Sequence, residues 1–191
     1  PFCRKCSRML QEIQENFIHD YLCQDCYLWE KDLKWKGILD SNKSVYSYND
    51  FMKEVIERFK YRGDLAIAEI FAEDIKTHVV GKEFDMFVPI PLSDIRMNER
   101  GFNQSEILIH IAGLMPTKIL VRTNSEKQSK KTKKERLKVS RLFELLDNID
   151  VNHKNILLID DIYTTGATIR NAALELKKAG AGRVESLTIA R

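Results

Sequence analysis

Residues 156–168 have the sequence ILLIDDIYTTGAT, and they carry the strongest structural signal in the chain. The first four residues form a continuous apolar run of strand length, which is typical of a central strand in a parallel sheet. Two carboxylates, Asp160 and Asp161, follow at once, at the carboxyl edge where α/β proteins bind ligands. A turn rich in threonine and glycine then leads into a helix. The segment therefore predicts a strand, a ligand-binding turn and a helix, in that order.

The turn has the chemistry of an anion site. Free backbone N–H groups at a helix start attract phosphate, and the helix dipole strengthens that attraction. The hydroxyls of Thr164, Thr165 and Thr168 add donors, and Gly166 allows close approach of the backbone to a phosphate. The paired carboxylates suit the vicinal hydroxyls of a sugar, and they can help to hold a divalent cation bridged to phosphate. A ribose with a phosphate on its 5′ carbon fits both halves.

This turn differs from the two common nucleotide-binding motifs. The chain contains neither the GxxxxGK[ST] phosphate loop nor the GxGxxG dinucleotide fingerprint. An ordinary strand–turn–helix corner, in which aspartate and threonine only cap the helix, remains the alternative. Two aspartates, three threonines and a glycine in this order favour the ligand site over that alternative.

Strands alternate with helices on the N-terminal side of this segment and after it. Apolar runs at 45–48, 84–90, 119–121 and 183–189 predict further strands. Asn103 and Glu106 resemble a capping box in front of a helix, and Gly180 provides a stop for the helix after residue 168. This alternation predicts an α/β domain with a mainly parallel sheet flanked by helices.

All four cysteines lie near the N-terminus, in two CxxC pairs: Cys3, Cys6, Cys23 and Cys26. This spacing matches the pattern of a tetrahedral zinc site, whose closed shell of four sulfur atoms holds structure rather than catalyses. Disulfides or a thioredoxin-like redox pair are the alternatives, but no secretory context or suitable strand–helix frame supports them. We expect a zinc-binding module with its linker over residues 1–40 and the α/β domain over residues 41–191.

Composition sets the class of protein. The 191 residues are 43% hydrophobic and 31% charged, which is normal for a globular protein with a core. No run of 18 or more apolar residues is present, so we expect no membrane span. No secretory signal is visible after Pro1, which favours a cytoplasmic location. The chain begins with proline rather than methionine, so further residues can precede Pro1.

Residues 122–141 contain nine Lys or Arg against two Glu, a local positive charge that favours phosphate-bearing partners.

The apolar strand, the paired acids and the TTGxT turn resemble the 5-phosphoribosyl 1-pyrophosphate (PRPP) motif of type I phosphoribosyltransferases. Together with the four-cysteine module, they resemble the ComF family over nearly the whole chain. Three more segments are similar to family landmarks: KYRGD at 60–64, VPIPL at 88–92 and RGFNQ at 100–104. The resemblance implies a phosphoribosyltransferase-type sheet and binding of PRPP with Mg²⁺.

The resemblance also assigns residues. It places PRPP against Asp160, Asp161, Tyr163, Thr164, Thr165, Gly166, Ala167 and Thr168. It also implies that a loop with Tyr61, Arg62 and Gly63 faces the pyrophosphate of PRPP. Arg96 and Arg100 are further candidate anion contacts.

The basic segment is similar to a loop of related proteins with Arg, Gln and Arg landmarks, here Arg122, Gln128 and Arg136. Lys131 and Val139 depart from the pattern, where an apolar residue and an Asn are common. A nucleic-acid contact through Lys130, Lys131, Lys133, Lys134 and Arg136 is one interpretation, and a solvated loop is the other. Single-stranded binders usually combine positive charge with stacking rings, and residues 122–142 contain no aromatic residue.

Three functions compete. The resemblance implies a competence-associated accessory protein for DNA import in natural transformation, with single-stranded DNA and a helicase-like ATPase as partners. An active phosphoribosyltransferase that transfers ribose 5-phosphate from PRPP to an unknown acceptor is the alternative, although no pocket for a base is evident in the sequence. A PRPP-sensing regulator that binds duplex DNA is the third, and it lacks a helix-turn-helix or winged module.

Overall fold

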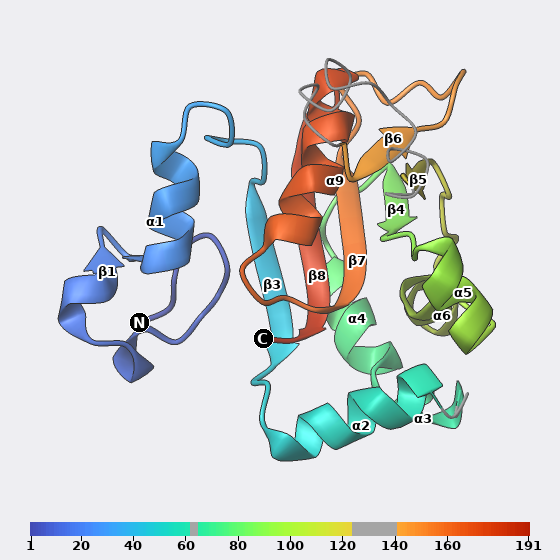
Figure 1. The fold of residues 1–191 in the computed structure, drawn as a ribbon, viewed down its shortest axis with the longest axis horizontal. Coiled ribbons are helices and arrows are strands. Elements are labelled where there is room, and N and C mark those ends of the chain that lie inside the picture. The colour runs from blue at the N-terminus through green and yellow to red at the C-terminus, as the bar shows by residue number, and fades with distance from the viewer. Residues whose placement is uncertain (62–64, 124–140) are drawn as a thin grey trace.

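A computed structural model of the chain describes residues 1–61, 65–123 and 141–191. A four-stranded sheet forms its centre, and the cysteine-bearing N-terminal segment lies beside the strand at one edge of that sheet (Figure 1). The strand order is β3 (Ser41–Tyr46), β8 (Val184–Ala190), β7 (Ile156–Ile162) and β4 (Met86–Pro89), and all neighbours are parallel. The α/β fold with a parallel sheet flanked by helices is therefore confirmed.

β7 has an interior position because its side chains are apolar on both faces. Ile156 and Leu158 point into one core, while Leu157 and Ile159 point into another, as the two-residue period of a strand requires. Each edge of β7 is paired, with Leu158 in register with Val88 on β4 and with Ser186 on β8. The continuous apolar run predicted this position.

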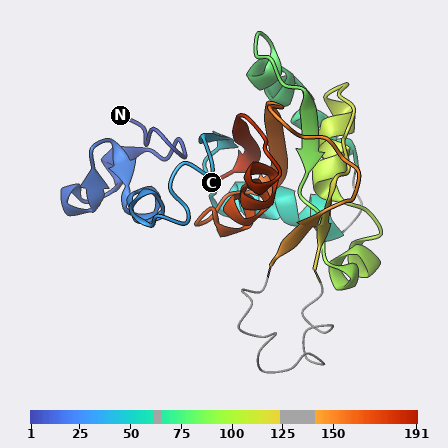
Figure 2. The same cartoon turned by 90° about the horizontal axis from the view of Figure 1, so that it is seen from above.

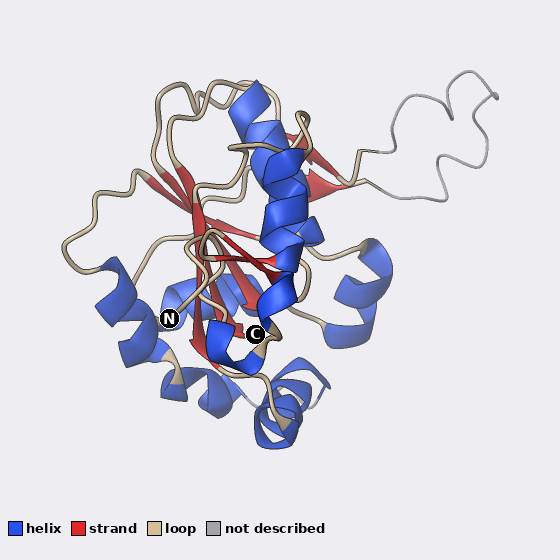
Figure 3. Cartoon of the chain, turned by 90° about the vertical axis from the view of Figure 1, so that its left-hand side faces the viewer, coloured by secondary structure: helices blue, strands red, loops and turns tan. Residues whose placement is uncertain are grey.

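Helices cover both faces of the sheet. The long helix α9 (Ala167–Lys178) lies across one face, where its buried residues share the core of Ile156 and Leu158 (Figures 2 and 3). On the opposite face lie α2 (Asp50–Tyr61), α3 (Leu65–Ile70), α4 (Ala72–Val79) and α6 (Gln104–Ile111). The two layers enclose the sheet and leave its strand ends free for a site.

The N-terminal module packs onto the α9 side of the sheet. It contains two short 3₁₀ turns (Leu10–Glu12 and Glu15–Phe17), a hairpin of β1 (Ile18–His19) and β2 (Leu22–Cys23), and α1 (Gln24–Lys31). Its four cysteines belong to the same core cluster as Leu158 and the buried face of α9. The expected boundary after residue 40 falls at the start of β3, and the division into two domains stays a prediction.

Two connections complete the described chain. The short helix α5 (Asp94–Arg100) follows β4, and an antiparallel pair forms from β5 (Leu120–Arg122) and β6 (Phe143–Leu145). Within the described ranges, no helix is both long and apolar enough to cross a membrane.

Local details differ from the sequence-based expectations. The strand predicted at 45–48 begins earlier, at Ser41, because it pairs with β8. The expected capping box is half formed: the Asn103 side chain accepts the backbone N–H of Ser105, whereas Glu106 binds Lys118 at 2.9 Å. Glu106 therefore forms an ion pair with Lys118, twelve residues away, in place of the predicted capping contact with the N-terminus of α6.

The central position of β7 yields a stability prediction. Leu158 is fully buried between two layers, so Leu158→Ala should lower the free energy of unfolding by about 2–5 kcal/mol in urea denaturation. Leu146→Ala is the control, because that side chain is 42% exposed and should cost less than about 0.5 kcal/mol. Equal losses for the two variants would contradict the central placement of β7.

Candidate sugar-phosphate site and four-cysteine centre

The acidic pair lies near the carboxyl end of β7 and is held by two other elements. Asp160 Oδ1 accepts the hydroxyl of Ser105 at 3.2 Å and the backbone N–H of Asp161 at 2.9 Å. Asp161 Oδ2 lies 2.7 Å from Lys60 Nζ, and both side chains of this ion pair are largely buried. The sequence pattern assigned no role to Lys60 or Ser105. Lys60 is the first residue of the KYRGD segment, and Ser105 directly follows the RGFNQ segment. This position was the sequence signal that could have predicted their contact with the acidic pair.

The two carboxyl groups have different electrostatic surroundings. Burial and, as the second cause, the adjacent Asp161 carboxylate raise the pKa of Asp160 from its ordinary value of 3.8 to about 7. The Asp161 backbone N–H, Lys60 and Ser105 oppose this shift without cancelling it. Asp161 is thus paired with Lys60, whereas burial and the neighbouring carboxylate favour the protonated form of Asp160.

The turn after β7 presents donors to solvent. Thr164 and Thr165 are exposed, and Gly166 adopts the left-handed region at φ +83° immediately before α9 begins. The side chain at Thr165 accepts the Ala167 N–H at 3.4 Å, and Thr168 lies in the first helical turn. Exposed hydroxyls and the start of a 12-residue helix therefore lie next to the acidic pair, as an anion site requires.

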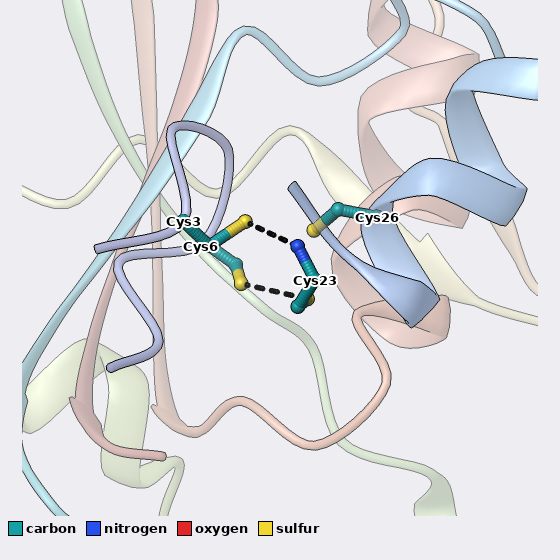
Figure 4. Close-up of side chains that lie close together, drawn as sticks. All are labelled: Cys3, Cys6, Cys23 and Cys26. Atoms are coloured by element: carbon teal, nitrogen blue, oxygen red, sulfur yellow. Dashed lines mark hydrogen bonds between the residues drawn. The ribbon is translucent and has the colours of Figure 1, made fainter. Parts of the chain in front are cut away.

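The four cysteines converge on one point although the two CxxC pairs are far apart in sequence (Figure 4). All four sulfur atoms lie within 4.8 Å of one another and are buried. Cys6 Sγ lies 3.6 Å from Cys23 Sγ, which is too long for a disulfide bond, and all four thiols are free. Four sulfur atoms around zinc, each about 2.3 Å from the metal, would be separated by about 3.8 Å. The donor set therefore fits a tetrahedral metal ion.

The cluster also has the polar surroundings of a thiolate site. The Cys23 backbone N–H donates to Cys3 Sγ at 3.3 Å, and guanidinium nitrogens of Arg170 and Arg191 lie 3.9 Å from Cys26 Sγ and 3.8 Å from Cys23 Sγ. In the second pair, Cys23 ends β2 and Cys26 lies in the first turn of α1, a strand–helix frame that the sequence pattern did not reveal. Since this pair meets the first one, four converging sulfur atoms replace an isolated redox dithiol.

Comparison with known proteins agrees with this geometry. Residues 65–191 match the family model described as "Phosphoribosyl transferase domain". The chain is 43% identical to Competence protein ComFC of Bacillus subtilis over 89% of this chain and 72% of that protein. It is 37% identical to Competence protein ComFC of Streptococcus pneumoniae over 88% of this chain and 74% of that protein. The chain belongs to the ComFC family.

A solved structure gives a more distant match to this ComFC-family chain. It is the structure described as glutamine phosphoribosylpyrophosphate (PRPP) amidotransferase from B. subtilis complexed with ADP and GMP. The TM-score is 0.44 at 18% identity, over 63% of this chain and 26% of that one.

The pyrophosphate-facing loop expected in a ComFC-family protein is described only at its first residue. Tyr61 ends α2, is exposed, and lies under the guanidinium of Arg100 at 5.1 Å from the ring centroid. Arg62 and Gly63 lie outside the described residues. Burial and the charge of Arg96 lower the pKa of Arg122, while Asp160 acts in the opposite direction. Arg122 therefore lies close enough to both Arg96 and Asp160 for their charges to act on it.

Tyr163 has a different place from the other predicted contacts of the turn. Its side chain is buried, and its hydroxyl accepts a hydrogen bond from Arg170 Nη1 at 2.5 Å. A Cβ atom on Gly166 would clash with this hydroxyl oxygen, so the turn rests directly on the Tyr163 ring. The tyrosine supports the turn from below, whereas Thr164 and Thr165 are available to a ligand.

A cavity of about 680 Å³ opens between the N-terminal module and β3, and it reaches the turn at Tyr163 and Thr164. Phe2 and Tyr48 contribute rings to its lining, and these side chains are 60% and 43% exposed. Arg8 and Lys43 contribute positive charge. The sequence pattern did not reveal this cavity, because its walls come from segments that only the fold brings together.

The predicted DNA contacts lie outside the described residues. They are Lys130, Lys131, Lys133, Lys134 and Arg136, and the landmark Gln128 and the departures Lys131 and Val139 fall in the same range. The DNA-contact assignment for this segment stays a prediction.

The raised pKa of Asp160 predicts a pH dependence of stability. The folded state holds this proton at pH values where the unfolded chain has lost it, so the free energy of unfolding should fall as pH rises from about 4 to about 7. Asp160→Asn should flatten that part of the profile and be more stable than the wild type at pH 8, as measured by urea denaturation across pH. Asp147→Asn, at an exposed position, should leave the slope unchanged. Parallel profiles for wild type and Asp160→Asn would refute the assignment.

Proposed function

We propose that this ComFC-family protein binds the ribose 5-phosphate part of PRPP and serves as an accessory protein in DNA import during natural transformation. The observation that carries the proposal is the acidic pair beside the exposed threonine turn at the start of α9. The phosphate accepts hydrogen bonds from the N–H groups and hydroxyls of 164–168, and the ribose hydroxyls donate to Asp160 and Asp161. The competence role rests on the relatives named Competence protein ComFC.

Two metal ions belong to the proposal. Zn²⁺ is held by Cys3, Cys6, Cys23 and Cys26 and stabilises the module, since four thiolates leave no open position for catalysis. Mg²⁺ enters with PRPP, and Asp160 and Asp161 are the carboxylates that would hold it, directly or through water. Bound there, Mg²⁺ neutralises phosphate charge.

Single-stranded DNA is the proposed macromolecular partner. The cavity next to Thr164 combines exposed rings with cations, the combination that single-strand binders use. The basic character of residues 122–141 adds long-range attraction for a phosphate backbone. The cavity has exposed aromatic side chains, which residues 122–142 lack.

A helicase-like ATPase is the proposed protein partner, and the cytoplasm is the proposed location. The partner follows from the ComF-family resemblance, and the location is the one that the sequence favoured. On the N-terminal module, Leu28 and Leu33 are 53% and 91% exposed, which provides apolar surface for a protein contact.

Calorimetric titration tests the ligand site. Mg²⁺–PRPP should bind the zinc-loaded wild type, and Asp160→Asn combined with Asp161→Asn should weaken binding at least about tenfold, because both sugar-hydroxyl acceptors lose their charge. Asp147→Asn with Asp150→Asn is the matched control at exposed loop positions. Absence of binding to wild type would sink the PRPP proposal, and release of pyrophosphate with an added base or amine would favour the transferase alternative.

Fluorescence anisotropy with a labelled thymidine oligonucleotide of about 16 nucleotides tests the DNA proposal. Phe2→Ala should weaken binding about fivefold or more, because a stacking ring is lost, and Lys43→Gln should reduce the dependence of affinity on salt by about one released ion. Phe51→Ala and Lys53→Gln are the controls, since these exposed side chains lie on α2 outside the cavity. If all four variants bind like wild type, the cavity is not the DNA site. If wild type itself does not bind, DNA is not the partner.

A further inference from the structure

Arg170 connects the four-cysteine centre to the turn that follows β7. It lies in the first turns of α9 and is fully buried. One guanidinium nitrogen, Nη1, donates to the Tyr163 hydroxyl at 2.5 Å, and the other, Nη2, lies 3.9 Å from Cys26 Sγ. The guanidinium also stacks on Trp29 of α1, 5.2 Å from the ring centroid. One side chain therefore contacts the turn after β7 (residues 163–166, the phosphate turn of the proposed function), a cysteine of the cluster and the helix that carries that cysteine.

Two parallel contacts reinforce this connection. The indole Nε1–H of Trp29 donates to the backbone carbonyl of Thr165 at 2.9 Å. Arg191 lies over the Tyr163 ring at 4.7 Å, and its Nη2 lies 3.8 Å from Cys23 Sγ. Both cysteines of the second CxxC pair are thus linked through a guanidinium to the same tyrosine.

The positive charge of Arg170 requires a negative group nearby, and the cysteine cluster is the candidate for that group. A fully buried guanidinium is costly unless a negative group lies beside it. Among the described residues, Arg170 forms no ion pair with a carboxylate; its contacts are a phenol, an indole ring and a sulfur atom, and its Nε has no hydrogen-bond partner. Four cysteines around a divalent metal ion are thiolates with a net charge of −2. A metal-loaded cluster therefore supplies the counter-charge for Arg170.

The backbone of the turn is packed directly on this pair of side chains. A Cβ atom on Gly166 would lie 2.5 Å from Arg170 Nη1 and would also clash with the Tyr163 hydroxyl oxygen. Because so little space remains, a shift of the guanidinium moves the tyrosine and the turn with it. The left-handed conformation of Gly166, at φ +83°, is therefore packed against the position that Arg170 occupies.

We propose that Arg170 is a positioning residue through which the metal-loaded cysteine centre holds the phosphate turn in its binding conformation. This inference rests on the proposed function, in that it takes zinc as the metal and a sugar phosphate as the ligand. Thermodynamic linkage then requires reciprocity: zinc raises the affinity for the sugar phosphate, and the sugar phosphate raises the affinity for zinc by the same factor.

The test uses zinc-loaded protein, with ribose 5-phosphate as the probe ligand. Arg170→Lys keeps the positive charge but loses the planar fork that reaches Tyr163 and Cys26 together. With zinc content confirmed by colorimetric release, we expect this variant to bind ribose 5-phosphate about 5–20-fold more weakly than wild type in calorimetry. In competition with a chelator, saturating ribose 5-phosphate should tighten zinc binding by a similar factor in wild type and not in Arg170→Lys. Arg183→Lys is the control, because Arg183 also stacks on a ring, Phe84, but precedes β8 at the opposite end of the strands.

A readout without ligand separates this inference from the proposed function. Amide hydrogen exchange of residues 163–168 should speed up about tenfold or more when zinc is removed, and also in zinc-loaded Arg170→Lys. Unchanged exchange in both, or equal ribose 5-phosphate affinity for wild type and zinc-loaded Arg170→Lys, overturns the positioning role. If wild type binds no ribose 5-phosphate while exchange still responds to zinc and to Arg170, the link stands and the proposed ligand is wrong.

Discussion

Burial of β7 on both faces is the constraint on which the rest of the structure depends. Its apolar side chains alternate between two cores, so the strand must have a paired neighbour on each edge and a helical layer on each face. The apolar run ends at Asp160 and Asp161, which still belong to β7 but require polar partners, because carboxylates cannot enter a core without them. The chain turns at the edge of the sheet, and the acidic pair, the threonine turn and α9 are placed there together.

The N-terminal module is tied to the same core. Its cysteines pack in one cluster with Leu158 and the buried face of α9, and two guanidinium groups from the α/β region lie next to their sulfur atoms. A segment this short cannot bury enough apolar surface to fold alone, and metal binding is the usual compensation. Here the module also adds a wall to the site, since the cavity beside Thr164 lies between its residues and β3.

Electrostatics around the acidic pair explains how two adjacent carboxyl groups are tolerated in a partly buried place. Lys60 neutralises Asp161, whereas Asp160 responds to burial and to its neighbour with a pKa of about 7. The hydrogen bonds from Ser105 and the Asp161 N–H to Asp160 hold its carboxyl group in place and favour its ionised form, against the effect of burial. Ribose hydroxyls or a divalent cation would stabilise the ionised form of this group.

Elements whose signals are local could be predicted from the sequence alone. The apolar run at 156–159, the acids that follow it, the glycine before α9 and the spacing of the CxxC pairs each depend on neighbouring residues, and the parallel sheet and the converging cysteines were predictable from them. Only the tertiary structure decided which distant side chains meet. Lys60 on Asp161, Ser105 on Asp160, and Arg170 between Tyr163 and Cys26 join segments far apart in the chain. The partner of a buried arginine in a helix, or of a serine after a loop, cannot be predicted from neighbouring residues. It depends on how the helices and the N-terminal module pack on the sheet.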